Sequence, residues 1–242
     1  MDLTTPTIRR FHWPKAIRDL HPEQERIVND FMQHWHEVLP RNYGRIEQFN
    51  HGYATRILPN SERFSTLELG AGLGGHIAFE DLSRQDYHCI ELRDPMADEI
   101  RRRYPTVTVK TGDVQERLPY DDSCFDRVVV IHVLEHLPNL PATLDESLRV
   151  LKPGGLFTVV LPCDPGLAYE IARKISAERI FRRRYKMPYG WFVRREHINS
   201  PEEIVYLLRE RFEQVDISYF PLIVPVINLN LCIGVTLKKA LA

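Results

Sequence analysis

The residues Glu68-Leu69-Gly70-Ala71-Gly72-Leu73-Gly74-Gly75-His76 decide the fold of this chain. The mixed apolar and acidic run 65–69 leads into them, and Ile77-Ala78-Phe79 follows. This order predicts a strand, a tight turn and then a helix over 75–82. Because glycine has no Cβ, a turn rich in it can bend sharply and lets a ligand come close to its backbone amides.

Gly70, Gly72 and Gly75 also have the spacing G-x-G-x-x-G, which is typical of loops that bind dinucleotides. Amides at the start of the helix that follows would meet a polar or anionic group of the ligand. The strand, the turn and the helix together predict a nucleotide-like ligand. The alternative is a plain connection between a strand and a helix.

Strands and helices alternate along the rest of the chain. Apolar runs and turn residues predict strands over 66–69, 87–92, 107–111, 125–132, 155–161, 215–219 and 228–237, with helices over 95–103 and 142–151. Such alternation predicts a parallel sheet, whose ligands bind at the carboxyl ends of its strands. Polar residues follow five of these ends: Gly70–Gly75, Glu91, Gly112-Asp113, His132 and Pro162-Cys163-Asp164.

Composition excludes several classes of protein. The net charge of -1 gives no overall attraction to nucleic acid, and 43% hydrophobic with 27% charged residues is ordinary for a globular protein. The four cysteines are widely spaced, which argues against a disulfide framework or a zinc site and fits the cytoplasm. We expect no signal peptide at the polar start of the chain and no membrane span.

The motifs, in this order, resemble those of the class I S-adenosylmethionine-dependent methyltransferases, in the small-molecule branch of methyltransferase type 11 and ubiquinone-pathway enzymes. The resemblance runs from about Thr66 to Leu161 and rests on Glu68–Gly74, Glu91, Gly112–Val114, Phe125–Val129, Val133–His136 and Leu151–Gly155. It implies an α/β fold with a Rossmann-like, seven-stranded, mostly parallel sheet. The last strand would be antiparallel, helices would cover both faces, and a helical cap would lie at the N-terminus.

The resemblance implies that S-adenosylmethionine is the cofactor. Glu68 and the glycine turn would meet its methionine part, Glu91 would hydrogen-bond the ribose, and Asp113 would accept from the adenine amino group. Glu91 and Asp113 each have a plainer alternative as a surface or turn residue. The residues implied to bind the cofactor are Glu68, Gly70, Ala71, Gly72, Gly74, Glu91, Leu92, Asp113, Val114 and His132.

Two histidines are candidates for catalysis, because a base helps when the methyl acceptor is a hydroxyl. His132 ends a predicted strand, and His197 precedes a helix that Ser200-Pro201-Glu202-Glu203 opens. The alternative for His132 is to line the cofactor pocket, and the alternative for His197 is a solvated loop residue. Glu135 and His136 match a pair associated with a divalent metal in ubiquinone-pathway enzymes, but those enzymes tend to carry an acid at the position of His132. We therefore expect no metal, and helix capping by Glu135 and His136.

The segment 167–195 is strongly basic and is interleaved with aromatic residues. It holds nine cations and two anions, a net +7, so the rest of the chain carries -8. The resemblance places it over the acceptor as a lid, and its charge predicts an anionic substrate. The residues predicted to bind that substrate are Arg182, Arg183, Arg184, Tyr189 and Trp191. Docking on an anionic membrane, RNA binding and a solvated basic helix are the alternatives.

The sequence therefore predicts methyl transfer to oxygen or nitrogen of a small, anionic acceptor such as a sugar, a nucleotide-sugar or a lipid-linked sugar. The cap would cover 1–60, including an amphipathic helix with Ile27, Phe31 and Trp35, and the methyltransferase domain would cover 61–242. An NAD(P)-dependent oxidoreductase with the same turn, an RNA methyltransferase and a non-catalytic binder are the alternatives. About 65 residues precede the glycine strand, which disfavours the oxidoreductase. The sequence predicts neither the oligomeric state nor the acceptor atom.

Overall fold

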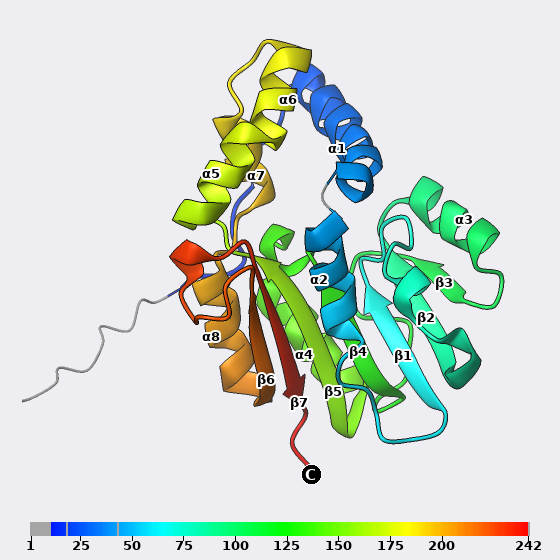
Figure 1. Ribbon diagram of the computed structural model, residues 1–242. Coiled ribbons are helices and arrows are strands. Elements are labelled where there is room, and N and C mark those ends of the chain that lie inside the picture. The colour runs from blue at the N-terminus through cyan, green and yellow to red at the C-terminus, as the bar shows by residue number, and fades with distance from the viewer. Residues whose placement is uncertain (1–10, 18, 43, 242) are drawn as a thin grey trace, which may run out of the picture.

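The computed structural model describes residues 11–17, 19–42 and 44–241, apart from the side chains of 33 and 35–42, so the side chain of Trp35 in the predicted amphipathic helix lies outside the described part. Its strands form one seven-stranded sheet in the order β3-β2-β1-β4-β5-β7-β6 (Figure 1). β1 to β5 pair in parallel, and β7 pairs antiparallel with both β5 and β6. The predicted sheet is thus confirmed. The strands are β1 Phe64–Leu69, β2 Gln85–Glu91, β3 Thr108–Thr111, β4 Phe125–Ile131, β5 Leu151–Pro162, β6 Glu213–Phe220 and β7 Cys232–Lys238.

Helices cover both faces of the sheet. Successive side chains of a strand point to opposite faces, so Val128 and Val130 of β4 share the core on one side with Leu144 and Ile204. These last two belong to α4 (Leu140–Val150) and α8 (Pro201–Arg211). α2 (Gly44–Ala54) lies across the other face, and α3 (Asp94–Arg103) stands beside β2 and β3 (Figure 1).

A close contact fixes α2 on the sheet. The ring of Tyr53 packs directly on Gly234 of β7, where an added Cβ would lie 2.3 Å from the ring. The hydroxyl of Tyr53 donates to Asp216 Oδ2 at 3.0 Å. The same helix then places the ring of His51 about 3.6 Å from a Cβ built on Gly75. One glycine of the sheet therefore sets how α2 approaches the glycine turn.

The helix predicted over 75–82 is wrong, because the chain forms only two single turns there, Ile77–Phe79 and Leu82–Arg84. A buried ion pair draws the connection onto the sheet. Arg127 is 0% exposed, and its Nη1 lies 2.7 Å from Glu80 Oε1, while its Nη2 donates to the carbonyl of Ala54. His76 Nε2 lies 2.7 Å from the same Glu80 oxygen. Satisfying this buried charge takes precedence over local helix propensity.

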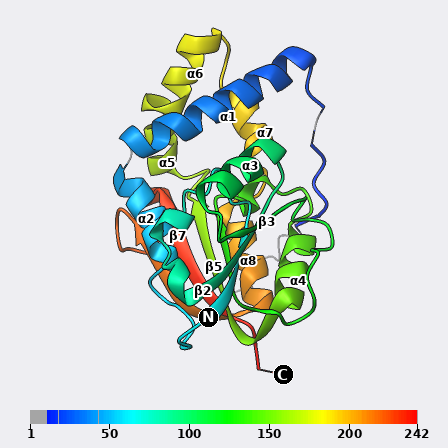
Figure 2. The same cartoon turned by 90° about the vertical axis from the view of Figure 1, so that its right-hand side faces the viewer.

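The remaining helices form a separate layer above the carboxyl ends of the strands. They are α1 (Pro22–Asn42), α5 (Leu167–Ile175), α6 (Ala177–Tyr185) and α7 (Gly190–Glu196). Phe31 of α1 meets Phe181 and Phe192 edge to face, with ring centres 5.1 and 5.2 Å apart. Figures 1 and 2 both show α1 beside α6. Among the described residues, no helix has both the length and the hydropathy that crossing a bilayer requires.

We expect Arg127→Leu to lower the free energy of unfolding by about 3–5 kcal/mol, because it leaves the Glu80 carboxylate buried without its partner. Urea denaturation at neutral pH measures this. The matched control is Arg102→Leu, which breaks the exposed Arg102–Glu99 pair on α3 and should leave the unfolding curve almost unchanged. Equal effects of the two substitutions would contradict a special role for the buried pair.

Candidate functional site

The glycine turn has the backbone that its composition predicts. Gly70, Gly72 and Gly74 have φ of 70°, 57° and 74°, in the left-handed region that favours glycine. A Cβ on Gly70 would lie 2.5 Å from a methyl group of Val133, so the turn is packed against the segment after β4. A Cβ on Gly72 would meet nothing within 4 Å, so this part of the turn is open to a ligand.

Glu91 joins the turn to the end of β2. Its Oε2 accepts from the amide of Gly72 at 2.9 Å, and its Oε1 accepts from the amide of Arg93 at 3.1 Å. A carboxylate can accept about four hydrogen bonds, so two of these positions stay available for ribose hydroxyls. Leu92 beside it is 61% exposed, although large apolar side chains are usually buried. An apolar surface next to an acid suits a nucleoside.

The end of β3 supplies the next two predicted residues. Asp113 Oδ1 accepts from the amide of Gln115 at 2.9 Å, and the side-chain amide of Gln115 lies 3.1 Å from the same oxygen. Val114 is 6% exposed and belongs to the core. The glycine turn and the ends of β2 and β3 lie on one edge of the parallel sheet, so the predicted residues there fit an adenosine group.

Glu68 has a different environment from the one that the resemblance implies. Its side chain is 3% exposed, and its Oε2 accepts from the hydroxyl of Tyr87 at 2.9 Å. Burial raises the pKa of Glu68 to about 8, against the opposing hydrogen bond from Tyr87. A contact between Glu68 and the cofactor stays a prediction.

His132 follows β4 in a left-handed conformation, with φ of 53°, which is uncommon for a residue other than glycine. Its Nδ1 lies 3.3 Å from Oε1 of Glu135, whose side chain is 2% exposed. Burial disfavours the charged ring, but hydrogen bonds with Cys232 and Glu135 outweigh it and raise the pKa of His132 to about 10. At neutral pH this ring is a cation, which donates hydrogen bonds rather than accepting a proton.

Asp164 and His197 form a pair at the end of β5. His197 Nδ1 donates to Asp164 Oδ2 at 2.6 Å. Asp164 is 4% exposed, and Nη1 of Arg173 on α5 holds both of its oxygens, at 3.1 and 3.0 Å. Because the Nδ1–H of His197 donates to Asp164, Nε2 is the ring nitrogen that can face a substrate. Sequence analysis named Asp164 only as a polar strand end, because its partner is 33 residues away.

Glu135 and His136 do not cap a helix, so that prediction is wrong. No side chain caps the single turn Leu134–His136 or the following α4. Asn199 instead holds the turn from above, because its Nδ2 donates to the carbonyls of Leu134 and Leu137 at 2.8 and 2.7 Å. The local sequence resembles a helix-capping pattern. The hydrogen bonds that hold the turn come instead from Asn199, which lies 65 residues after Leu134 and 62 after Leu137.

The turn brings Glu135, His136 and His197 together. Each offers one ligand atom, and these atoms lie within 4.8 Å of one another, which is a spacing that could hold a metal ion. His136 Nδ1 donates to the carbonyl of Glu196, and burial lowers the pKa of His136, so its ring is neutral. A metal-binding histidine commonly donates its second nitrogen in this way. The absence of a metal stays a prediction.

The residues predicted to bind substrate lie in the upper helical layer. Tyr189 is 6% exposed and packs on Phe181 at 5.1 Å between ring centres. Trp191 also packs on Phe181, at 6.0 Å. Arg182 pairs with Glu178 of its own helix at 2.7 Å. Arg184 pairs with Asp30 of α1 at 2.8 Å, and the exposed Arg183 forms no ion pair with a described residue. Substrate binding by these residues stays a prediction.

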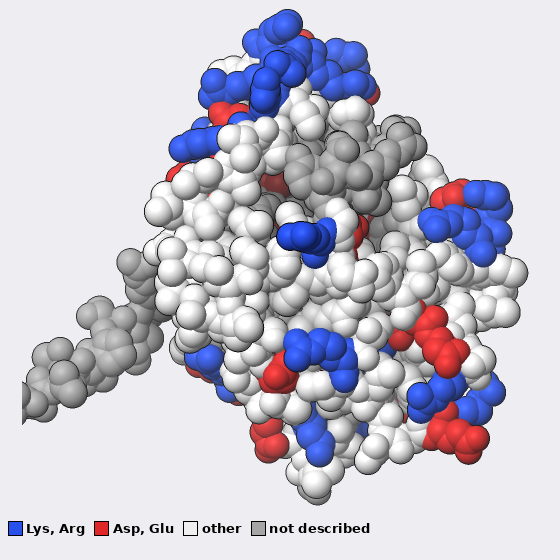
Figure 3. Space-filling model, viewed as in Figure 1, with Lys and Arg blue, Asp and Glu red and all other residues white. Residues whose placement is uncertain are grey.

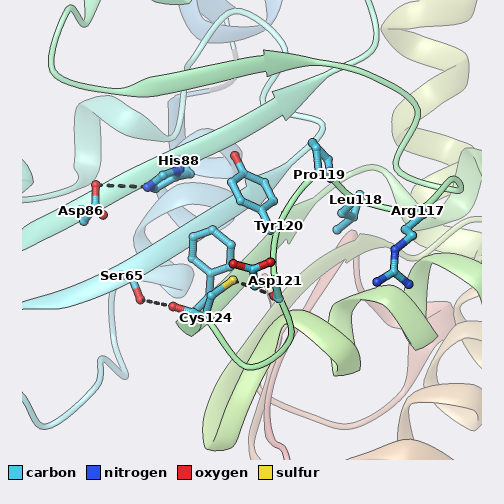
Figure 4. A pocket seen from close by; sticks show the side chains of 10 residues that line it. Ser65, Asp86, His88, Arg117, Leu118, Pro119, Tyr120, Asp121 and Cys124 are labelled. Atoms are coloured by element: carbon cyan, nitrogen blue, oxygen red, sulfur yellow. Dashed lines mark hydrogen bonds and ion pairs between the residues drawn. The ribbon is translucent and has the colours of Figure 1, made fainter.

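A hollow of about 580 Å³ lies at the amino ends of β1 and β4, away from the glycine turn (Figure 4). Ser65, His88, Tyr120 and Cys124 are among its lining residues. His88 Nε2 lies 3.1 Å from Asp86, whose side chain is 73% exposed. Ligands of parallel sheets bind at the opposite edge, so we do not assign the cofactor to this hollow.

We expect Glu68→Gln to stabilise the protein at pH 8 and to have little effect near pH 5. The folded pKa of Glu68 is about 8 and its ordinary value is 4.5. The stability that its protonated form contributes is therefore complete below pH 4.5 and is lost as the pH rises through 8. Glutamine keeps the acceptor for Tyr87 without the charge. Urea denaturation of both proteins between pH 5 and 9 gives the difference, and a flat difference would contradict the raised pKa.

Comparison with known proteins supports the geometry. The family model described as a methyltransferase domain matches residues 67–159. The "Probable S-adenosylmethionine-dependent methyltransferase" of Mycolicibacterium smegmatis is 36% identical over 97 residues, 40% of this chain and 37% of that protein. Sterol 24-C-methyltransferase of Aspergillus fumigatus is 32% identical over 126 residues, 48% of this chain and 32% of that protein. The chain thus matches less than half the length of these relatives.

Solved structures share the fold. A chain from the Haloferax volcanii complex of the Trm112 methyltransferase activator and a putative methyltransferase gives a TM-score of 0.61 at 15% identity, over 93% of this chain and all of that one. An S-adenosylmethionine-dependent methyltransferase of Methanosarcina mazei gives 0.56 at 19% identity, over 75% of this chain and 95% of that one. The strand order and the glycine turn together show the fold of the class I S-adenosylmethionine-dependent methyltransferases, and residues 67–159 match the methyltransferase domain family.

Proposed function

We propose that this protein transfers a methyl group from S-adenosylmethionine to a hydroxyl oxygen of a small molecule, with His197 as the base. The observation that carries the proposal is the 2.6 Å hydrogen bond between the partly exposed His197 and the buried Asp164, at the carboxyl edge of the parallel strands. A nitrogen acceptor, which the sequence also allowed, does not by itself call for such a pair.

The cofactor supplies an electrophilic methyl group on a sulfonium. Glu91, Leu92, Asp113 and Val114 would hold its adenosine, and the open turn at Gly72 would receive its amino-acid part. Holding donor and acceptor in line is the main contribution that the protein can make to such a reaction. Transfer of that methyl group to the acceptor oxygen would release S-adenosylhomocysteine and the hydroxyl proton, and Nε2 of His197 would accept this proton.

His197 suits the role of base better than His132 does. The ring of His132 is already protonated at neutral pH, since its pKa is raised to about 10 despite burial. It is therefore a hydrogen-bond donor near the reacting groups. Asp164 orients His197 and stabilises the imidazolium that forms, and Arg173 keeps Asp164 in place from α5.

For the acceptor we propose a hydroxyl on a largely apolar molecule. The prediction of an anionic acceptor depended on Arg182, Arg183 and Arg184. Two of these, Arg182 and Arg184, pair with acids of the upper helical layer. Names of relatives point to lipids: one is a sterol methyltransferase, and another, from Mycobacterium leprae, is a phthiotriol/phenolphthiotriol dimycocerosates methyltransferase, 30% identical over 107 residues. The aromatic ring of Tyr169 lies 6.1 Å from the ring of His197.

We expect S-adenosylhomocysteine, but not NAD, to raise the melting temperature. At a free concentration of about 100 times its dissociation constant, a ligand of the native state adds about 2.7 kcal/mol. Glu91→Ala should weaken this binding by roughly tenfold or more, because it removes a charged hydrogen-bond acceptor. Glu116→Ala, an exposed acid of the neighbouring loop, is the control. Stabilisation by NAD instead would favour the oxidoreductase.

We expect His197→Gln to lower kcat by about 100-fold to 10,000-fold with little change in cofactor affinity, as loss of a general base does. Release of S-adenosylhomocysteine with a sterol, a long-chain diol and a phenol as acceptors measures this. Asp164→Asn should also lower kcat, and the exposed His12→Gln serves as control. Removal of metal tests the same residues in another way. Activity that EDTA abolishes and a divalent cation restores would make His197 a ligand and contradict its role as base.

A further inference from the structure

The outer face of α5 is apolar and has no cover among the described residues. Leu167, Ile171 and Ile175 follow one another at helical spacing and are 58%, 54% and 71% exposed. The inner face of the same helix carries Tyr169 and Arg173, which lie at the Asp164–His197 pair. This helix therefore separates the candidate catalytic pair from an exposed apolar surface.

The loop between β6 and β7 extends this surface. Ile223 at its tip is 91% exposed, and the other exposed apolar residues of the loop are Leu222, Val224, Val226 and Leu229 at 43–46%. The loop lies against α5, because a Cβ on Gly166 would come within 3.0 Å of the carbonyl of Ile227. Figure 1 shows the loop directly below α5.

A buried asparagine gives the loop a fixed shape. Asn230 is 0% exposed; its Oδ1 accepts from the amide of Leu222 at 2.8 Å, and its Nδ2 donates to the carbonyls of Val224 and Val226 at 2.9 Å. These hydrogen bonds hold the backbone so that the apolar side chains stay exposed. Exposure of apolar surface to water is by itself unfavourable. We call the exposed apolar residues of α5 and of this loop the apolar platform.

Cations from the end of α5, from α6 and from the residue after α6 gather around one hollow. Lys174, Arg179, Arg182, Arg183 and Lys186 surround a hollow of about 360 Å³, together with the single acid Glu178. No ion pair is recorded for Arg179, Arg183 or Lys186 among the described residues, and all three are exposed. In Figure 3 the basic side chains gather over α6, and the surface over α5 below them is largely uncharged.

We propose that the apolar platform and the cations of α6 dock this protein on an anionic lipid bilayer. Apolar side chains would enter the boundary between head groups and acyl chains, and the cations would meet anionic head groups at the same depth. RNA explains the charge less well, because stacking needs exposed aromatic rings, and Phe181, Tyr189 and Phe192 are buried. A protein partner would account for the apolar platform but not for the unpaired cations.

The test is co-sedimentation of the full chain with vesicles of phosphatidylglycerol and phosphatidylcholine in equal parts, compared with phosphatidylcholine alone. We expect binding to the anionic vesicles that weakens with salt. Ile175→Glu with Ile223→Glu should lower the partition coefficient by about 30-fold or more. The matched control is Val215→Glu with Leu241→Glu, which changes residues 48% and 75% exposed outside the platform. All four positions are exposed, so folding should survive, as thermal unfolding checks.

A second test variant and its control examine the contribution of the cations. Arg179→Gln, Arg183→Gln and Lys186→Gln together should weaken binding on the order of 100-fold, at roughly fivefold for each cation at the surface. Arg101→Gln, Arg102→Gln and Arg103→Gln on α3 remove the same charge elsewhere and should change it little. Equal loss in test and control variants, no binding to anionic vesicles, or binding to a single-stranded RNA alone would each overturn the proposal. If membrane binding fails while S-adenosylhomocysteine still stabilises the protein, the docking proposal is wrong and the proposed cofactor binding is not affected.

Discussion

The parallel pairing of β4 with β5 is the constraint on which the candidate site depends. Ile131 pairs with Val160, and the amide of His132 donates to the carbonyl of Val160 at 3.0 Å. Because the two strands run side by side in the same direction, the residues after each of them emerge at one edge of the sheet. Asp164, which pairs with His197, and His132 therefore both follow strand ends at the same edge of the sheet.

The upper helical layer depends on a different interaction, the packing of aromatic rings between segments far apart in the sequence. Phe31 of α1 contacts rings from α6 and α7, so the start of the chain and the segment after β5 form one layer. Aromatic burial of this kind contributes both area and edge-to-face attraction. The inward orientation of the rings leaves the cations and the apolar stripe of α5 on the outside of the layer.

Sequence predicts the strands well because their patterns are local: apolar runs such as 128–131 and the glycine turn need no distant partner to be recognised. It fails where a distant residue decides. The helix over 75–82 is lost to Arg127, and Glu135 is held by contacts made from Asn199. Asp164 and His197 are separated by the helices α5, α6 and α7, and no sequence periodicity indicates that the two residues meet. The aromatic residues of 167–195 have the same spacing whether they face a ligand or a core, so the sequence leaves that choice open.

The contact of Tyr53 with Gly234 has a consequence for how this enzyme class could vary. A side chain at position 234 would displace Tyr53 and tilt α2 without touching the glycine turn. His51 would move too, since Tyr53 and His51 belong to the same helix. A residue in the last strand, opposite Val160 of β5, can therefore adjust from a distance how α2 lies against the glycine turn. Sequence changes there would tune affinity through geometry, while every group that touches the ligand stays the same.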